Sequence, residues 1–238
     1  MTTILHIDSS ARPGRSGDQA HGSHTRRLTA RFIARYRQLD SGTKVIYRDV
    51  GAEPPSPVTG AWVHAAFTPP AARESWMVKE LAQSDVLVEE LLRADIIVAG
   101  VPMYNFGPPA QFKAWLDNIV RVGRTFGFDR SRPGEPYWPL LADAGKHLVI
   151  LSSRGDYGYG PGQRLESINH VEGSVRSVFR YLGVTDACGA AIEYDEFADE
   201  RLASSIADAE RATDRLAEGI AASRSGRRQD LESLAIMA

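Results

Sequence analysis

Five short apolar runs of strand length alternate with longer helical patterns along this chain of 238 residues. The runs cover residues 3–8, 43–50, 95–100, 146–152 and 184–193, and the clearest helical patterns cover residues 25–39, 80–93, 171–182 and 199–222. Strands that alternate with helices form parallel sheets, because each helix returns the chain to the edge where the next strand begins. The alternation therefore predicts an α/β protein built on a five-stranded parallel sheet.

Right-handed crossovers place helices on both faces of such a sheet, so we expect it to be doubly wound. Five strands favour the flavodoxin-like order 2-1-3-4-5, in which ligands lie beyond the carboxyl ends of the strands. We expect one domain over residues 1–222. Residues 223–238, with several arginines at their start, are expected to form a mobile, solvated extension.

The composition is that of an ordinary globular protein, with 43% hydrophobic and 24% charged residues. A formal net charge of -2 provides no basic surface for nucleic acid or anionic lipid, so neither partner is expected. No apolar run approaches the roughly 20 residues that span a bilayer. The single cysteine, Cys188, offers no internal disulfide and no export segment precedes the first strand, so we expect a cytoplasmic location.

Two long segments, residues 51–70 and 123–139, show no helix or strand pattern. Connections of this length usually cover a functional site or are disordered. These two are too aromatic for plain linkers, so we interpret them as the rim of a pocket and as contacts of a dimer. Their aromatic residues include Trp62, Phe67, Phe126, Phe128, Tyr137 and Trp138.

The third strand-like run ends in the turn Pro102-Met103-Tyr104-Asn105-Phe106, and a helical pattern follows it. Such a turn gathers backbone N–H groups, an amide side chain and aromatic faces at one point. This combination suits a flat heteroaromatic ring with a polar edge, and we interpret it as a flavin-binding turn. A nucleotide base or a packed core could use the same residues.

The loop after the first strand is rich in hydroxyl and glycine residues and leads into the first helix. A helix N-terminus offers unpaired N–H donors, so Ser10, Ser23, His24 and Thr25 there could bind a phosphate monoester. The alternative is that Ser23 is only the N-cap of the helix. There is no glycine-rich dinucleotide fingerprint and no Walker lysine, and the histidines of this loop lack the partners of a metal site.

The loop after the fourth strand is Ser153-Arg154-Gly155-Asp156, followed by further glycines that let the backbone approach a ligand closely. Ser153 and the following amides would face the pyrimidine edge of a flavin, where negative charge develops on reduction. Alternatively, Arg154 pairs with a carboxylate and the glycines only shape a turn.

Together these residues resemble the family of FMN-dependent NADH:quinone reductases and azoreductases, which are flavodoxin-like homodimers. The turn from Pro102 to Phe106 and the helix over residues 111–117 are the most specific part of the resemblance, which runs from residue 3 to about 222. It implies tightly bound FMN, NADH or NADPH as the electron donor, quinones or azo compounds as acceptors, and ping-pong two-electron hydride transfer. The implied cofactor contacts are Ser10, Ser23, His24, Thr25, Pro102, Met103, Tyr104, Asn105, Phe106, Ser153, Arg154, Gly155 and Asp156.

Among these residues, Asn105 is expected to orient the flavin edge, while Tyr104 and Phe106 shape the pocket as catalytic-site residues. Tyr157 and Phe126 are candidate walls for the acceptor. The first loop is longer than is usual in the family. Asp156 stands where the family commonly has a glycine, so we expect its carboxylate to point away from the flavin.

Three alternatives stay open at this point. A flavodoxin-type electron carrier shares the fold, but is usually smaller and more acidic. A non-catalytic flavin-binding interaction module could use the same loops. FAD could also replace FMN, although a site for a terminal phosphate at Ser23 and Thr25 favours FMN.

Overall fold

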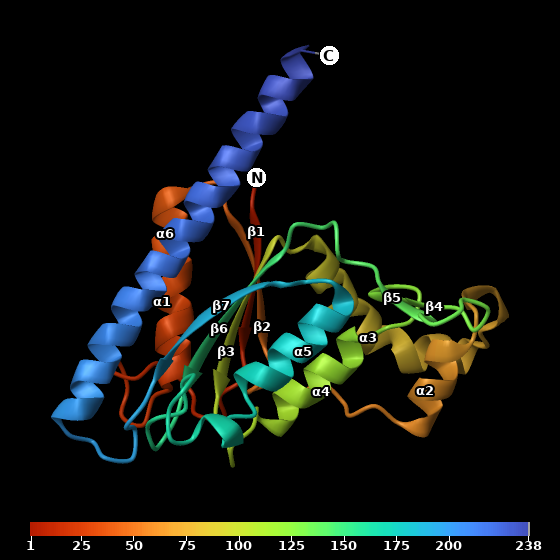
Figure 1. Cartoon of the computed structure of the whole chain (residues 1–238). Coiled ribbons are helices and arrows are strands. Elements are labelled where there is room, and N and C mark those ends of the chain that lie inside the picture. Colours follow the sequence, from red (N-terminus) through yellow and green to blue (C-terminus); the bar gives the residue numbers. More distant parts are fainter. Residues whose placement is uncertain (238) are drawn as a thin grey trace.

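The computed structural model describes residues 1–237, with side chains described for residues 1–226. Its centre is a five-stranded parallel sheet in the order β2-β1-β3-β6-β7 (Figure 1). Leaving out the two short strands β4 and β5, this corresponds to the predicted order 2-1-3-4-5. The strands of the sheet are β1 (Thr3–Asp8), β2 (Lys44–Asp49), β3 (Ile96–Pro102), β6 (His147–Ser153) and β7 (Asp186–Ile192).

Helices cover both faces of the sheet, as Figure 1 shows. β3 and β6 are buried along their whole length, as is typical of central parallel strands that are covered on both sides. Leu91, Trp115 and Phe179 contribute to the apolar cluster on one face, and Leu28 and Phe32 to the cluster on the other. The first face carries α3 (Ser75–Arg93), α4 (Ala110–Ile119) and α5 (Glu172–Leu182), and the second carries α1 (His24–Leu39) and α6 (Glu200–Met237).

A ladder of ion pairs joins α1 to α6. Arginines spaced four residues apart on α1 meet carboxylates spaced four residues apart on α6, so the rungs lie along one face of each helix. Exposed pairs of this kind each contribute about 0–1 kcal/mol, and their main effect here is to set the register of the two helices. The rungs are Arg27–Glu210 (2.6 Å), Arg31–Asp214 (2.7 Å) and Arg35–Glu218 (2.6 Å).

The prediction of no regular structure in residues 51–70 is wrong, because α2 (Gly60–Phe67) lies there. The hydroxyl of the N-cap Thr59 accepts a hydrogen bond from the backbone N–H of Trp62. Trp62 and the buried alanines of α2 pack against Met77 and Leu81 of α3. A helix this short spans too few turns for its periodicity to be visible in the sequence. The single turn η1 (Pro70–Ala72) follows, and α3 begins at Ser75 instead of residue 80.

Residues 123–139 also contain regular structure that the sequence pattern missed. β4 (Phe126–Phe128) pairs antiparallel with β5 (Tyr137–Pro139), outside the main sheet. A Cβ atom on Gly127 would lie 2.0 Å from the ring of Trp138, so a glycine is required where this ring crosses the strand. Strands of three residues are too short to show alternation. The loop after β6 likewise holds a single turn, η2 (Glu166–Ile168).

α6 continues to Met237, past residue 222 where the predicted helix ended. The added segment contains no proline, and the single Gly226 is not enough to end a helix. Arg224 forms an ion pair of 2.8 Å with Asp95, just before β3. Figure 1 shows the helix projecting beyond the sheet at the side of the N-terminus. That residues 223–238 form a mobile, solvated extension stays a prediction. None of the helices in the described part of the chain has the length and apolar character that crossing a membrane requires.

The glycine at the end of α5 provides a test of the fold. Gly183 has φ +101°, and a Cβ atom there would lie 2.5 Å from the backbone nitrogen of Ala142. Gly183→Ala is therefore expected to lower the free energy of unfolding by about 1–3 kcal/mol, measured by urea denaturation.

Gly219 is the matched control, because it lies inside α6 and a Cβ atom there would meet nothing within 4 Å. Gly219→Ala is expected to raise the free energy of unfolding by about 0.5–1 kcal/mol. Equal effects of the two substitutions would contradict the left-handed cap of α5.

Candidate active site

A cavity lies at the carboxyl edge of the sheet, where the chain leaves β1, β3, β6 and β7. It brings the three predicted loops together and adds a fourth, between β7 and α6. Its volume is about 200 Å³, below the usual 300–1,000 Å³ of ligand pockets. It is lined by Ser10, Arg12, Ser23, His24, Pro102, Met103, Tyr104, Ser153, Arg154, Gly155, Asp195 and Glu196.

The loop after β1 is bonded directly to the turn after β3. The backbone N–H of Ala11 donates to the hydroxyl of Tyr104 at 3.1 Å. The side chain of Gln111, on α4, donates to the carbonyl of Ser9 at 3.0 Å. Ser10 is buried beside these contacts, and its hydroxyl accepts from the N–H of Arg12 at 3.2 Å. The first loop and the turn thus form one continuous wall.

The start of α1 presents three polar residues, of which Ser23 and His24 line the cavity. The hydroxyl of Ser23 accepts from the N–H of Arg26 at 3.3 Å and lies 3.0 Å from the hydroxyl of Thr25. Ser23 is therefore the N-cap of α1, as the alternative interpretation of the sequence held. Thr25 is fully buried beneath it and does not line the cavity. The first-turn N–H groups of a helix lack intrahelical partners, so they remain suited to an anion.

The extra residues of the first loop form a compact excursion beside this helix start. The N–H of Ser23 donates to the carbonyl of Gly14 at 3.1 Å, and the N–H of Ser16 donates to the carbonyl of Ser23 at 3.1 Å. These bonds close the loop at its base, so its extra length does not displace the start of α1.

The turn after β3 is a two-residue turn with left-handed backbone at both central positions. Asn105 has φ +48° and Phe106 has φ +70°, while Tyr104 and Gly107 exchange backbone hydrogen bonds of 2.9 and 3.1 Å. A non-glycine residue in this region costs about 1–2 kcal/mol. The side chain of Phe106 is about half exposed, and neither Asn105 nor Phe106 lines the cavity, although Met103 and Tyr104 just before them do.

The third loop combines the two alternatives considered for Arg154. Its buried guanidinium forms ion pairs with Glu172 and Glu193, and it also lines the cavity. Gly155 beside it has no side chain, and a Cβ atom there would lie 2.3 Å from a carboxylate oxygen of Glu196. The absence of a side chain at Gly155 therefore lets the loop after β7 close against the loop after β6.

The acidic residues Asp195 and Glu196 were missed in the sequence. The carboxylate of Asp195 is hydrogen-bonded to Nε2 of His24 at 3.0 Å and forms an ion pair of 3.1 Å with Arg12. The hydrogen bond from His24 and the nearby positive charges outweigh burial and lower the pKa of Asp195. The available signal was positional, because Asp195 follows the last strand at the same sheet edge as the other loops.

Besides Thr25, Asn105 and Phe106, three further predicted residues lie outside the cavity. The carboxylate of Asp156 faces Arg164 at 2.6 Å, and its orientation away from the flavin stays a prediction. Tyr157 stacks on Tyr194 with ring centroids 4.7 Å apart. Phe126 lies in β4, buried beside Tyr181, and does not reach the cavity of its own chain. No group of three or more potential metal ligands occurs in the part of the chain that the structure describes.

The sheet order, the helices on both faces and the cavity at the carboxyl edge define a flavodoxin-like protein. A family model described as flavodoxin-like fold matches residues 2–216. The azoreductase from Bacillus anthracis superposes with a TM-score of 0.77 at 23% identity, covering 91% of this chain and 99% of that one, which supports the fold.

Two relatives are much more similar to this chain in sequence than the azoreductase is. The FMN-dependent NADH:quinone oxidoreductase 2 of Idiomarina loihiensis is 42% identical over 209 residues, which cover 88% of this chain and 86% of that protein. The FMN-dependent NAD(P)H:quinone oxidoreductase 1 of Pseudomonas aeruginosa is 38% identical over 211 residues, or 88% of this chain and 95% of that protein. The chain belongs to the family of FMN-dependent NADH:quinone oxidoreductases.

The backbone of the turn can be tested at Asn105. Alanine tolerates positive φ less well than glycine, and Asn105 is exposed, so packing contributes little to the comparison. Asn105→Ala is expected to have a free energy of unfolding about 1 kcal/mol below that of Asn105→Gly. Urea denaturation of the two variants measures the difference. An alanine variant as stable as the glycine variant would rule out the left-handed turn.

Proposed function

We propose that this protein is an FMN-dependent NAD(P)H:quinone oxidoreductase that also reduces azo compounds. The observation that carries the proposal is the meeting of three loops in one cavity: the hydroxyl-rich loop at the start of α1, the turn after β3, and the Ser153–Gly155 loop. The names of the relatives support the cofactor, the donor and the acceptor class.

The residues of the cavity suit FMN. The hydroxyls of Ser10 and Ser23, with the N-terminus of α1, would hold the terminal phosphate without a metal. Met103 and Tyr104 would pack against the ring, and the amides near Gly155 would contact its pyrimidine edge. When bound, FMN supplies the group that accepts hydride from the nicotinamide and passes two electrons to the acceptor.

The chain's own contribution is position and access. Asn105 and Phe106, which follow the cavity-lining Met103 and Tyr104, would orient the ring edge and border the face on which donor and acceptor stack in turn. Arg12 offsets the carboxylate of Asp195, and Arg154 offsets those of Glu172 and Glu193. Because apolar stacking discriminates by only about 1–3 kcal/mol, we expect many flat quinones and azo compounds to be accepted.

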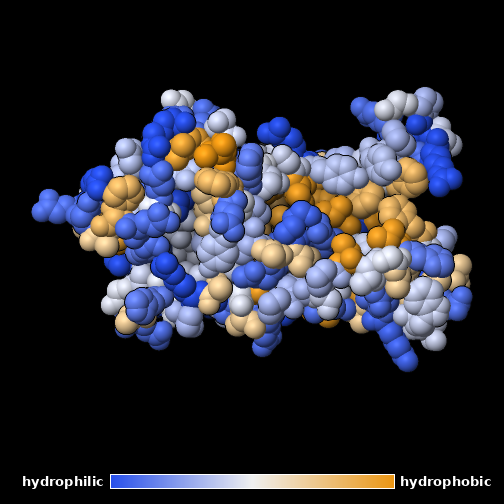
Figure 2. All heavy atoms as spheres, turned by 90° about the horizontal axis from the view of Figure 1, so that it is seen from below, coloured by the Kyte–Doolittle hydropathy of each residue, from blue (hydrophilic) through white to orange (hydrophobic). Residues whose placement is uncertain are grey.

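We propose a homodimer that completes the site. Exposed aromatic side chains lie on and beside the β4–β5 hairpin: Phe67 is 53% exposed and contacts Phe128, and Tyr137 is 48% exposed and lies beside Tyr181. Viewed onto the carboxyl edge, Figure 2 shows hydrophobic side chains gathered over the half of the molecule that carries α2 and the hairpin. Apolar surfaces of this kind mark association sites. Phe126, buried beneath this surface, would then approach the partner's cavity as a wall for the acceptor.

The dimer can be tested at Phe67. We expect light scattering to give about twice the 26.1 kDa of one chain, and Phe67→Asp to shift the protein toward the monomer, because a charge in an apolar interface lacks a partner. Leu39→Asp is the control, since Leu39 is similarly exposed at the end of α1. A monomeric wild-type protein would contradict the proposal.

The activity is tested on purified protein. We expect a yellow protein that releases FMN and oxidises NADH with a benzoquinone without any partner reductase. A yellow protein without this turnover would favour an electron carrier, and a colourless protein unable to take up flavin would favour an interaction module. Release of FAD would identify the alternative cofactor.

Asn105→Gly is expected to weaken FMN binding or slow turnover by about threefold to tenfold, because it removes an amide that bonds the ring edge. Ala198→Gly is the control, because Ala198 also has positive φ but has no amide side chain and is not among the residues proposed to contact FMN. Unchanged FMN affinity and unchanged turnover in Asn105→Gly would contradict the role of the amide.

We also propose that residues 1–222 form the functional domain, with residues 223–238 as an extension. A cytoplasmic location is our expectation for a chain whose single cysteine, Cys188, is free. Localisation of a tagged protein in cell fractions would test it.

A further inference from the structure

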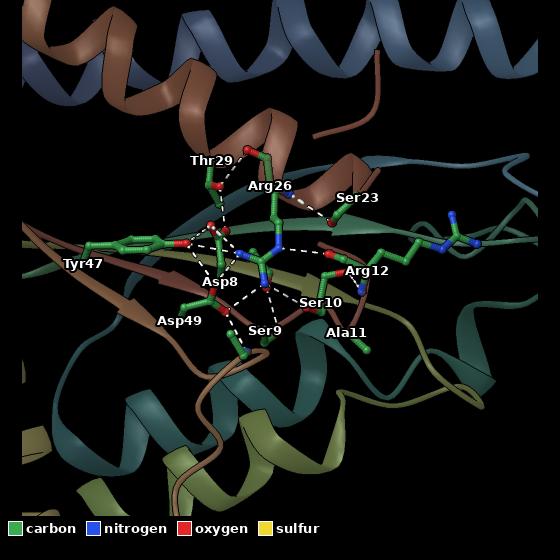
Figure 3. Close-up of polar contacts among 12 residues, drawn as sticks. Asp8, Ser9, Ser10, Ala11, Arg12, Ser23, Arg26, Thr29, Tyr47 and Asp49 are labelled. Carbon is green, nitrogen blue, oxygen red and sulfur yellow. Dashed lines mark hydrogen bonds and ion pairs between the residues drawn. The ribbon is translucent and has the colours of Figure 1, made fainter. Parts of the chain in front are cut away.

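Behind the first loop, a buried arginine joins β1 and β2 to that loop. Figure 3 shows the guanidinium of Arg26, on α1, between carboxylates on one side and backbone carbonyls on the other. Asp49 binds it in bidentate fashion, at 2.6 and 2.8 Å. Asp8 lies 3.5 Å away, and the hydroxyl of Tyr47 accepts from the guanidinium at 3.1 Å.

The other side of the same guanidinium binds the loop itself. Nη2 of Arg26 donates to the carbonyl of Ser10 at 3.0 Å, and Nε donates to the carbonyl of Arg12 at 3.1 Å. Only a planar fork of several donors can bond a carboxylate and two carbonyls at once, so lysine cannot reproduce the arrangement.

These contacts determine where the loop points. In a trans peptide the C=O and the N–H point in opposite directions, so bonding the Ser10 carbonyl to Arg26 turns the Ala11 N–H away from it. That N–H is the group that donates to the hydroxyl of Tyr104. Arg26 therefore holds the conformation in which the first loop and the turn after β3 meet, although Arg26 itself does not line the cavity.

The charges around Arg26 keep it ionised and in place. Burial alone would lower the pKa of Arg26, but the hydrogen bonds that it donates to Asp49 and the charges of Asp8 and Asp49 raise it. For Asp8, burial is outweighed by His6, which lies 3.4 Å away, by the hydrogen bond from Thr29 and by the charge of Arg26, which lower its pKa. Removing the guanidinium would leave a buried carboxylate without its partner.

We infer that Arg26 is the positioning residue of the phosphate-binding loop, and that it sets the preference of the protein for a phosphorylated flavin. This inference rests on the proposed function. Arg26 acts through the loop that carries Ser10, and it contacts no ligand directly. Its loss should weaken the binding of the phosphate end. The turn after β3 has backbone bonds of its own, from Met103 to Ser153 and between Tyr104 and Gly107, so the contacts of the ring should be nearly unchanged.

The test compares FMN with riboflavin, which has the same ring and lacks the phosphate. Dissociation constants are measured by quenching of flavin fluorescence on the apoprotein, with thermal melting recorded for each variant. We expect Arg26→Lys to weaken FMN about tenfold or more and to change riboflavin by less than about twofold. Arg27→Lys is the control, because Arg27 is the neighbouring residue and pairs with Glu210 of α6 instead of the first loop. We expect it to change neither the FMN nor the riboflavin dissociation constant.

Asp49→Asn is a milder second variant, which decides the question if Arg26→Lys does not fold. Asp49 is only partly buried, and its loss loosens Arg26 without removing it. We expect a smaller loss of FMN affinity, again with riboflavin nearly unchanged.

Equal losses for FMN and riboflavin would show a general structural role and overturn the inference. Equal affinities of the wild-type protein for the two flavins would overturn it as well, because the phosphate would then contribute nothing. A wild-type protein that binds neither flavin would refute the proposed function instead.

Discussion

The pairing of β1 with β3 is the constraint on which the site depends. The chain leaves β1 toward β2 on one side, while β3 and β6 follow on the other, so the loops after β1 and β3 diverge at the carboxyl edge. Parallel sheets open a crevice for ligands at such a point. The register of these strands places Asp8 opposite Gly100 and Pro102 opposite Ser153, which brings the loops after β1, β3 and β6 to a common level.

Buried arginines then hold the irregular segments around this crevice. Arg26 bonds the first loop, and Arg154 joins the third loop to α5 and the end of β7. Arg121, fully buried beneath the segment that leads to β4, bonds Ser84 at 2.7 Å and pairs with Asp85 at 3.1 Å. A buried guanidinium is costly to desolvate, so each needs carboxylates or other acceptors around it. The loops of the site are consequently coupled to the core through charged groups as well as through apolar packing.

Several features of the molecule suit a role that needs open access. The turn after β3 keeps two non-glycine residues at positive φ, a strained conformation that persists where the surroundings enforce it and that is common at functional sites. The cavity is small and open, while an aromatic surface lies at the hairpin end of the molecule. In the homodimer proposed above, a second copy would cover that surface.

The sequence by itself determined the sheet, the long helices and the three loops that meet in the cavity, because hydrophobic periodicity and turn residues are local signals. It also carried the turn from Pro102 to Phe106, on which the resemblance to the family depends. Only the tertiary structure decided the short elements α2, β4 and β5 and the presence of Asp195 and Glu196 in the site. It also decided the distance of Phe126 from the site and the bonding of Arg26 to the first loop. These depend on contacts between residues far apart in the chain, such as His24 with Asp195, and no local pattern records which distant partner a side chain will meet.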